Sequence, residues 1–136
     1  MKYHHKAFVR WDDLDAMGHV NNARYLTFAQ EGRFEWSFAK NPIAASDNTF
    51  LRMVVARAEV DFKNAIFQGG TYVDVVLWVE SIGNSSFTMI YEVKGEDVLF
   101  ARIRTVQVAV DESIAKSRSL NDEERGFLQQ YLEESK

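Results

Sequence analysis

Long runs of alternating apolar and polar residues between positions 54 and 110 restrict the fold of this chain more than any other feature. A strand points successive side chains to opposite faces, so a period of two predicts strands with one buried face. In the first run the expected inward residues are Val54, Ala56, Ala58, Val60 and Phe62. Further runs at 72–80, 87–93 and 98–110 are separated by turn residues at 83–84 and 95–97. The pattern predicts an antiparallel meander.

One long helix is predicted before these strands, over residues 23–39. Its main apolar face has helical spacing and consists of Tyr25, Phe28, Ala29, Gly32, Trp36 and Ala39. Because Leu26, Phe34 and Phe38 add a second apolar side, we expect the helix to be largely enclosed. Asn21 and Asn22 can cap its start near Asn22, and Asn41-Pro42 ends it, since the residue before proline avoids the α region. Residues 41–50 are therefore predicted to be a loop.

Shorter elements at the two ends complete the predicted order. Residues 6–11 favour a strand, and residues 122–134 form an apolar stripe behind Asn121, a candidate N-cap. One strand, one apolar helix, four strands and a terminal helix are typical of an α+β protein. A strongly curved antiparallel sheet wrapped around the long helix buries that helix better than a flat sheet. The sequence thus predicts a hotdog fold, as a single domain over residues 1–136.

Composition excludes several classes of protein. The chain has 136 residues, 46% of them hydrophobic and 26% charged, which suits one packed domain. The absence of cysteine excludes disulfides, thiolate catalysis and cysteine-ligated metals, and favours a cytoplasmic location. A net charge of −4 disfavours broad binding to nucleic acid. The N-terminus does not resemble a signal peptide, and no window approaches the ~20 apolar residues that span a membrane.

Polar residues are densest between Asp12 and Tyr25, in the predicted connection from the first strand to the helix. Aspartate and asparagine are ordinary turn formers, so an aspartate-rich turn is one interpretation and a functional loop is the other. The adjacent pair His4-His5 lacks metal-ligand spacing, and we expect no metal site. Glycine-rich phosphate loops and the Gly-x-Ser-x-Gly elbow are also missing, which disfavours dinucleotide enzymes and serine hydrolases.

Residues 13–25, DLDAMGHVNNARY, resemble the signature of the hotdog-fold acyl thioesterases of the 4-hydroxybenzoyl-CoA thioesterase superfamily, roughly D-x-D-x-x-G-H-V-x-N-x-x-Y. Segments 60–62, 81–87 and 108–111 are also similar to strand and turn segments of that family, so the resemblance covers residues 6–133. It implies hydrolysis of an acyl-CoA thioester, or of an acyl-carrier-protein thioester, without a cofactor.

The resemblance places the catalytic carboxylate on Asp15, as nucleophile or general base. A carboxylate beside the first turn of a helix is held ionised by the helix dipole, as both routes require. The resemblance puts the oxyanion donor at the backbone N–H of Asn22, at the helix start. His19 matches a catalytic histidine of plant-type acyl-carrier-protein thioesterases, although Met17 stands where those enzymes have asparagine. A structural role for His19 stays equally open.

Five residues are candidates for contact with the substrate: Asp13, Gly18, Tyr25, Ser85 and Ser86. Asp13 can instead hold the loop through hydrogen bonds, and Tyr25 can be a core tyrosine with its hydroxyl at the rim. The two serines match a position from which family members reach across a dimer. An exposed sheet edge also favours pairing, so a dimer or a dimer of dimers is expected.

Other interpretations of the same residues stay open. Gly83-Asn84 stands where some 4-hydroxybenzoyl-CoA enzymes carry an arginine pair for the nucleotide phosphates. A catalytically weak acyl-binding module is therefore the main alternative function, and a hydratase-like hotdog enzyme is a third. Four basic residues form either a rim for CoA or a charged outward face: Arg57, Lys63, Arg102 and Arg104. Glu31 and Glu35 on the helix either face the site or form ion pairs.

Overall fold

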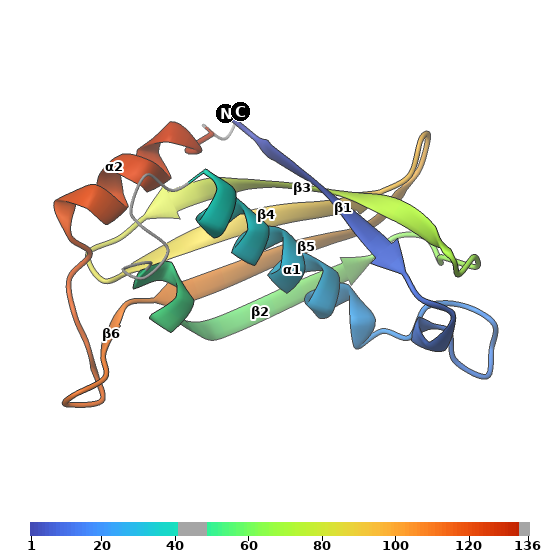
Figure 1. The fold of residues 1–136 in the computed structure, drawn as a ribbon, viewed down its shortest axis with the longest axis horizontal. Helices are drawn as coiled ribbons and strands as arrows, with labels where there is room; N and C mark the ends of the chain where they lie inside the picture. The colour runs from blue at the N-terminus through green and yellow to red at the C-terminus, as the bar shows by residue number, and fades with distance from the viewer. Residues whose placement is uncertain (41–48, 134–136) are drawn as a thin grey trace.

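Five antiparallel strands in the spatial order β1-β3-β4-β5-β2 form one sheet, and a long helix lies across its inner face (Figure 1). The structure is a computed structural model that describes residues 1–40 and 49–133. The strands of this sheet are β1 (Tyr3–Val9), β2 (Val54–Phe62), β3 (Thr71–Ile82), β4 (Ser86–Lys94) and β5 (Leu99–Val108). The other elements are two short 3-10 helices (Trp11–Asp13 and Thr49–Arg52), α1 (Arg24–Ala39), β6 (Val110–Asp111), β7 (Lys116–Ser117) and α2 (Asp122–Gln130). The predicted α+β hotdog fold is confirmed.

Helix α1 packs on the inner face of the sheet through the predicted apolar stripe. Tyr25, Phe28, Ala29, Gly32 and Trp36 are all buried. The predicted second apolar side is wrong for the single chain, because it faces away from the sheet. Its members stay 36–52% exposed, and they are Leu26, Phe34 and Phe38. The helix also begins at Arg24, slightly later than predicted.

The sheet has two different faces. Its inner face contributes the alternating apolar residues of β3 and β4 to one core with α1, as their period of two predicts. On the outer face, Val76, Trp78 and Ile90 form a small separate cluster under charged side chains. Arg104 pairs there with Glu80 at 2.9 Å. The outward-face interpretation of Arg102 and Arg104 is therefore confirmed, since Arg102 also lies on this side, near Trp78.

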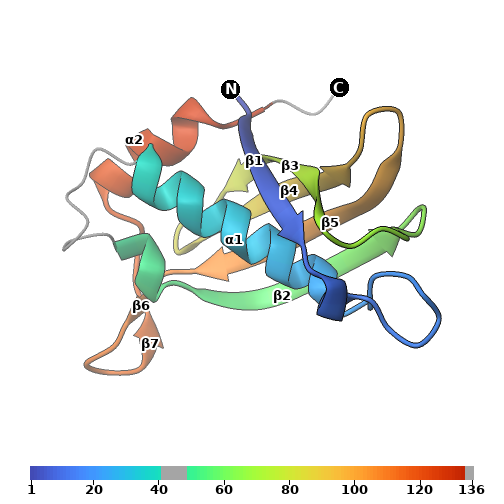
Figure 2. The ribbon, with the colours of Figure 1, turned by 45° about the vertical axis from the view of Figure 1, so that its right-hand side comes forward.

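Strand β2 departs most from its prediction. It pairs with β5 rather than β3, so the meander comprises β3, β4 and β5 only, and β2 forms the far edge of the sheet. A bulge between Val55 and Arg57 shifts the alternation, which leaves Val54 and Ala56 out of phase with the rest of the predicted inner face. Helix α1 does not cover this edge (Figure 2). Val55 and Phe62 are consequently about half exposed.

The terminal helix packs beside the end of β3. The predicted N-cap is confirmed, because the Asn121 side chain accepts a hydrogen bond from the Glu124 N–H at 2.8 Å. The helix ends at Gln130, earlier than predicted, and residues 134–136 lie outside the described part. Beyond the helix, Leu132 forms a parallel bridge to Val79, which fastens the end of the described chain to β3.

The remaining boundaries need small corrections. The first strand covers Tyr3–Val9 rather than 6–11, because Trp11–Asp13 turn into a 3-10 helix. Most of the predicted loop 41–50 lies outside the described residues, and its last two residues, Thr49 and Phe50, begin another 3-10 helix. Among the described helices, none is long and apolar enough to cross a membrane.

A buried carboxylate ties the C-terminal helix to the body of the fold. Glu124 is fully buried, and Arg118 donates to both of its oxygens at 2.8 and 2.9 Å. Burial by itself raises the pKa of Glu124, but hydrogen bonds from Arg118, Thr49 and the Asn121 N–H outweigh burial and lower it. The ionised form is therefore the native one.

Replacing Arg118 by methionine tests this arrangement. Arg118→Met leaves a buried charge without its cation, and we expect a loss of about 3 kcal/mol in the free energy of unfolding at pH 7. Since the folded pKa of Glu124 is lowered, its contribution is present above the ordinary value of 4.5 and is lost as the pH falls below it. When urea unfolding is measured between pH 7 and pH 3, the free energy of unfolding should thus fall less on acidification for the variant than for the wild type. Equal stability of the two proteins at pH 7 would contradict the assignment.

Candidate active site

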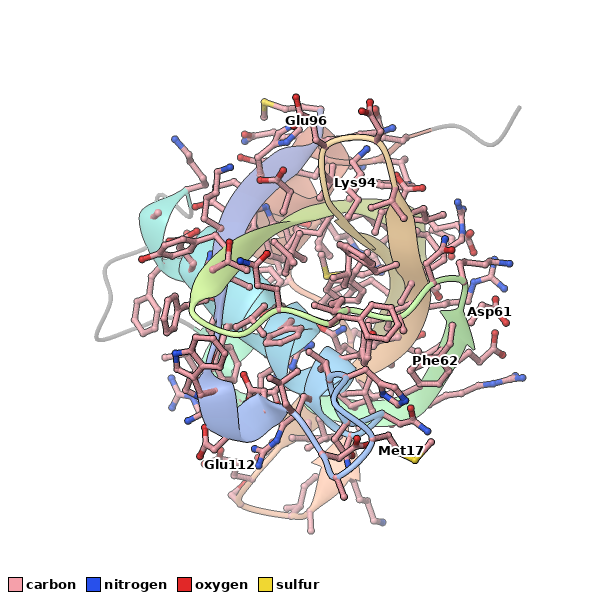
Figure 3. All side chains as sticks on the ribbon, turned by 90° about the vertical axis from the view of Figure 1, so that its right-hand side faces the viewer. Met17, Asp61, Phe62, Lys94, Glu96 and Glu112 are labelled. Atoms are coloured by element: carbon pink, nitrogen blue, oxygen red, sulfur yellow. The ribbon has the colours of Figure 1, made fainter. Side chains whose placement is uncertain are left out.

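The connection between the first 3-10 helix and α1 folds into a tight hairpin around Gly18. Leu14 bridges to Val20, the Asp15 N–H donates to the His19 carbonyl at 3.0 Å, and the Gly18 N–H donates to the Asp15 carbonyl at 3.0 Å. Gly18 has φ +80°, a left-handed conformation that glycine adopts without strain. The predicted candidate Gly18 therefore has a clear role in the turn. Figure 3 faces this end of the molecule, with Met17 on the hairpin and Phe62 at the end of β2.

The Asp15 side chain is held on one oxygen. Its Oδ1 accepts a hydrogen bond from the Met17 N–H at 2.9 Å, an arrangement typical of aspartate in a turn. The other oxygen, Oδ2, has no hydrogen-bond partner among the described residues, and the side chain is 28% exposed. One carboxylate oxygen is thus fixed by the backbone, while the second is free to act on a ligand.

His19 lies beside Asp15. Its Nδ1 is 3.9 Å from Asp15 Oδ1, and the same nitrogen is 3.5 Å from the Val20 carbonyl. The imidazole edge packs on the Phe67 ring, with centroids 6.1 Å apart. Both interpretations of His19 remain compatible with this geometry, because the ring contacts the backbone and also stands within reach of the carboxylate.

The start of α1 leaves one backbone donor free. The Asn21 N–H donates to the Asp13 carbonyl, that of Ala23 to Asn21 Oδ1, and that of Arg24 to the Asn21 carbonyl. The Asn22 N–H donates to no acceptor among the described residues. The N-cap of α1 is Ala23, without a side-chain cap, so the predicted capping by Asn21 or Asn22 is wrong. Asn21 instead closes a turn just before the helix. The Asn22 N–H, the predicted oxyanion donor, is available to a ligand.

A small pocket of about 190 Å³ opens at this point. It brings together three of the predicted site residues, His19, Asn22 and Tyr25. Its other wall comes from the end of β2 and the following connection, and consists of Phe62, Lys63, Asn64 and Ala65. Asp15 does not line the pocket itself, but its Oδ1 lies 3.9 Å from Nδ1 of the lining residue His19. No group of three or more metal-binding side chains occurs in the described ranges.

Tyr25 connects the pocket to the core. Its ring is buried and packs edge-on against Phe62 at 5.1 Å. Burial raises the pKa of the Tyr25 hydroxyl, and a hydrogen bond from the Ile66 N–H opposes that shift. A core tyrosine with its hydroxyl at the rim is what the structure shows, and contact with a substrate stays a prediction.

Asp13 and the two serines lie elsewhere. Asp13 is buried, accepts from the Arg10 N–H at 2.9 Å and from Arg10 Nη2 at 3.0 Å, and lies 3.5 Å from Arg24 Nε. It holds the loop, as one of the two sequence interpretations proposed. Ser85 and Ser86 follow β3, whose 12 residues separate them from the hairpin by roughly 35 Å within one chain. One chain therefore cannot bring these serines to Asp15.

The connection after β2 contributes residues that the sequence did not predict. Asn64 and Ala65 line the pocket, and Phe67 contacts His19 while 71% exposed. Trp11 is equally exposed, and its ring lies flat on Gly69, where an added Cβ would come within 2.8 Å of it. The only signal for this wall in the sequence is an asparagine and a phenylalanine in the connection between two strands.

Comparison with known proteins identifies the family. The family model described as the thioesterase-like superfamily matches residues 9–127. The chain belongs to the thioesterase-like superfamily. A curated relative from Nostoc punctiforme, 1,4-dihydroxy-2-naphthoyl-CoA hydrolase, is 30% identical over 126 residues, which cover 90% of this chain and 84% of the relative. This thioesterase-like chain therefore shares nearly its whole length with an enzyme named for a CoA thioester.

Solved structures agree with the fold of this thioesterase-like protein. A predicted thioesterase from Bacillus stearothermophilus superimposes with a TM-score of 0.86 at 27% identity, over 100% of both chains. A thioesterase from Thermus thermophilus, in complex with coenzyme A and Zn, gives a TM-score of 0.81 at 28% identity, over 94% of this chain and 92% of that one. The matches extend through both the hairpin and the sheet.

The buried Asp13 should stabilise the hairpin that carries Asp15. Asp13→Asn places amide hydrogens against the donors of Arg10, so we expect a loss of about 2 kcal/mol in the free energy of unfolding. Asp12→Asn is the matched control, because the Asp12 side chain is 78% exposed and should contribute little. Urea unfolding of the two variants makes the comparison. Equal effects at both positions would show that Asp13 does not hold the loop.

Proposed function

We propose that this protein hydrolyses an acyl-CoA thioester to the free acid and CoA. The observation that carries the proposal is that a half-free Asp15 carboxylate lies beside His19, which lines the same pocket as Asn22 with its unused N–H. A general base or nucleophile and an oxyanion donor are the two groups that acyl transfer needs most. The CoA substrate named for the Nostoc relative supports the choice of thioester.

In the proposed reaction, the thioester carbonyl oxygen accepts the Asn22 N–H, which stabilises the negative charge that develops on it. Asp15 Oδ2 then acts in one of two ways. As a base it takes a proton from the attacking water and passes it to the departing CoA thiolate. As a nucleophile it bonds to the carbonyl carbon and expels the thiolate, and water then cleaves the resulting anhydride to regenerate the carboxylate.

His19 and Lys63 lie at the same mouth. His19 stands 3.9 Å from Asp15, where a ring N–H can donate to the carboxylate or to the leaving group. Lys63 lines the pocket and forms no ion pair within the described residues, which suits a contact with a CoA phosphate. A cytoplasmic location, where CoA thioesters are made and used, belongs to the same proposal.

We also propose that two copies pair through β2. The strand lies at the sheet edge with apolar residues exposed, and pairing would satisfy its free backbone groups. Val54 lies beside Val108, which in turn pairs with Ser86, whereas Phe62 borders the pocket. Antiparallel pairing of two β2 strands places the Val54 end of one beside the Phe62 end of the other. The turn with Ser85 and Ser86 of a second copy then approaches the pocket.

Removal of the Asp15 charge tests the proposed chemistry. Asp15→Asn should lower kcat about a hundredfold or more, because the amide is neither a base nor a useful nucleophile. Release of CoA thiol from short, long and aromatic acyl-CoAs measures the rate, and the chain itself has no cysteine to react. Asp97→Asn, in an exposed turn and outside the pocket lining, is the matched control.

The outcomes separate the candidate functions. Turnover by the wild type and loss in Asp15→Asn support the thioesterase. If the protein hydrolyses acyl-carrier-protein thioesters and no acyl-CoA, the same mechanism applies to the carrier-protein substrate. Tight binding of acyl-CoA without turnover identifies an acyl-binding module, and undiminished turnover in Asp15→Asn rules out Asp15 as the catalyst.

A charge on β2 should separate the proposed dimer. Ala58 is exposed on the inner face of β2, so Ala58→Asp places a carboxylate where an apolar contact is expected. Light scattering should give twice the chain mass of 15.7 kDa for the wild type and the single mass for the variant. Ile114→Asp, an exposed apolar residue between β6 and β7, should leave the dimer intact. A monomeric wild type would contradict the pairing.

A further inference from the structure

A buried polar cluster lies under α1, away from Asp15. Arg33 Nη1 donates to the Tyr91 hydroxyl at 3.1 Å, and Gln107 Nε2 donates to the same oxygen at 3.2 Å. The hydroxyls of Tyr91 and Thr105 share a hydrogen bond of 2.8 Å. Tyr91, Thr105 and Gln107 are at most 2% exposed, whereas Arg33 is only partly buried. The cluster therefore holds the guanidinium from one side and leaves its other side accessible.

Arg33 has no carboxylate partner in the described part of the chain. Glu35 on the same helix turns toward β1, where its carboxylate lies 2.6 Å from His5 Nδ1 and accepts from Tyr3. The inner-face residues of the sheet are apolar or neutral, and the acidic residues of β2, Glu59 and Asp61, lie in the outward phase. Arginine stays charged in proteins and carries five N–H donors, of which the cluster engages one.

The position of Arg33 relates it to the pocket. Arg33 lies eight residues after Tyr25 on α1, which is about 12 Å along the helix axis. Leu26, seven residues before Arg33 and thus on the same side of the helix, is exposed. Across from this side run Ala58 and Val60 on the inner face of β2. The residues named between the pocket and Arg33 are therefore apolar.

A second copy does not supply the missing negative charge. In the proposed pairing through β2, the partner would present the same inner face and the same side of α1. Neither surface carries a carboxylate among the described residues. Within the described ranges Arg33 therefore has no counter-charge, and its guanidinium carbon lies 5.4 Å from the centre of the Phe34 ring. A negatively charged group on a ligand would supply that counter-charge.

We infer that Arg33, positioned by Tyr91, Thr105 and Gln107, binds a carboxylate at the far end of the acyl group, so that the substrate is an acyl-CoA whose acyl chain carries a distal carboxylate. This inference rests on the proposed function and deepens it. A guanidinium offers two parallel N–H groups to such an oxygen pair. Plain fatty acyl chains would leave the cation unpaired, and the enzyme should discriminate against them.

Matched pairs of thioesters test the inference. Adipoyl-CoA against hexanoyl-CoA and suberoyl-CoA against octanoyl-CoA probe a distal carboxylate at two chain lengths. For the wild type we expect kcat/KM to favour the oxygenated member of at least one pair by about tenfold to hundredfold, the usual range for a hydrogen bond to a charged group. Arg33→Leu should abolish the preference, mainly by lowering kcat/KM for the oxygenated member.

Three further variants define the roles. Arg33→Lys should retain part of the preference, because the charge remains while the planar fork is lost. Tyr91→Phe should raise KM for the oxygenated substrate with little change in kcat, as expected of a positioning residue. Arg102→Leu, which removes an arginine from the outer face, should leave the preference unchanged. If Arg33→Leu unfolds, Arg33→Gln replaces it.

Ligand affinity tests the role of Arg33 independently of turnover. Non-hydrolysable thioether analogues of the same pairs are titrated against wild type and Arg33→Leu by calorimetry. Tighter binding of the oxygenated analogue by the wild type alone supports the site, even if no thioester is cleaved and the proposed function fails. Equal binding of both analogues, a preference that survives Arg33→Leu, or dissociation of the dimer in Arg33→Leu overturns the inference, and hydrolysis would then stand without it.

Discussion

The close contact between α1 and the sheet at Gly32 fixes the rest of the structure. A Cβ at this position would lie 3.2 Å from Leu77 and 3.3 Å from Val75, so the helix backbone sits almost directly on β3. That approach sets the height and direction of α1 over the inner face. One end of the helix thereby presents the Asn22 N–H at the pocket, and the other end buries Trp36 against Phe127 from α2. Helix and sheet therefore position Asn22 and Tyr25 more firmly than the hairpin alone could.

Local patterns predicted most of the fold because they depend on neighbouring residues. The period of two predicted β3, β4 and β5, and the helical spacing predicted the buried face of α1. Each pattern arises because one face of the element is buried. The cap at Asn121 follows from the chemistry of a helix terminus. The hairpin motif likewise led to Asp15, His19 and Asn22, which the structure gathers at one end, although their catalytic roles stay predictions.

The remainder depends on contacts between distant residues. Nothing local indicates that β2 pairs with β5 instead of β3, or that a bulge after Val55 changes its phase. The pocket wall at Asn64 comes from a connection whose path depends on where β2 ends. The sequence predicts Asp13 to be a polar loop residue, yet its side chain is buried beside Arg10 and Arg24. The contacts of Arg33 could not be predicted from the sequence for the same reason, because its partners come from β4 and β5.

The tryptophans occupy environments that an optical experiment can separate. Trp36 and Trp78 are 0% and 8% exposed, whereas Trp11 is 71% exposed and rests on Gly69 next to the hairpin. Indoles in water emit at longer wavelengths than buried ones, so the red edge of the emission belongs mainly to Trp11. The protein thus carries an exposed intrinsic fluorophore just before the hairpin, and changes in the surroundings of that segment can be followed without any attached label.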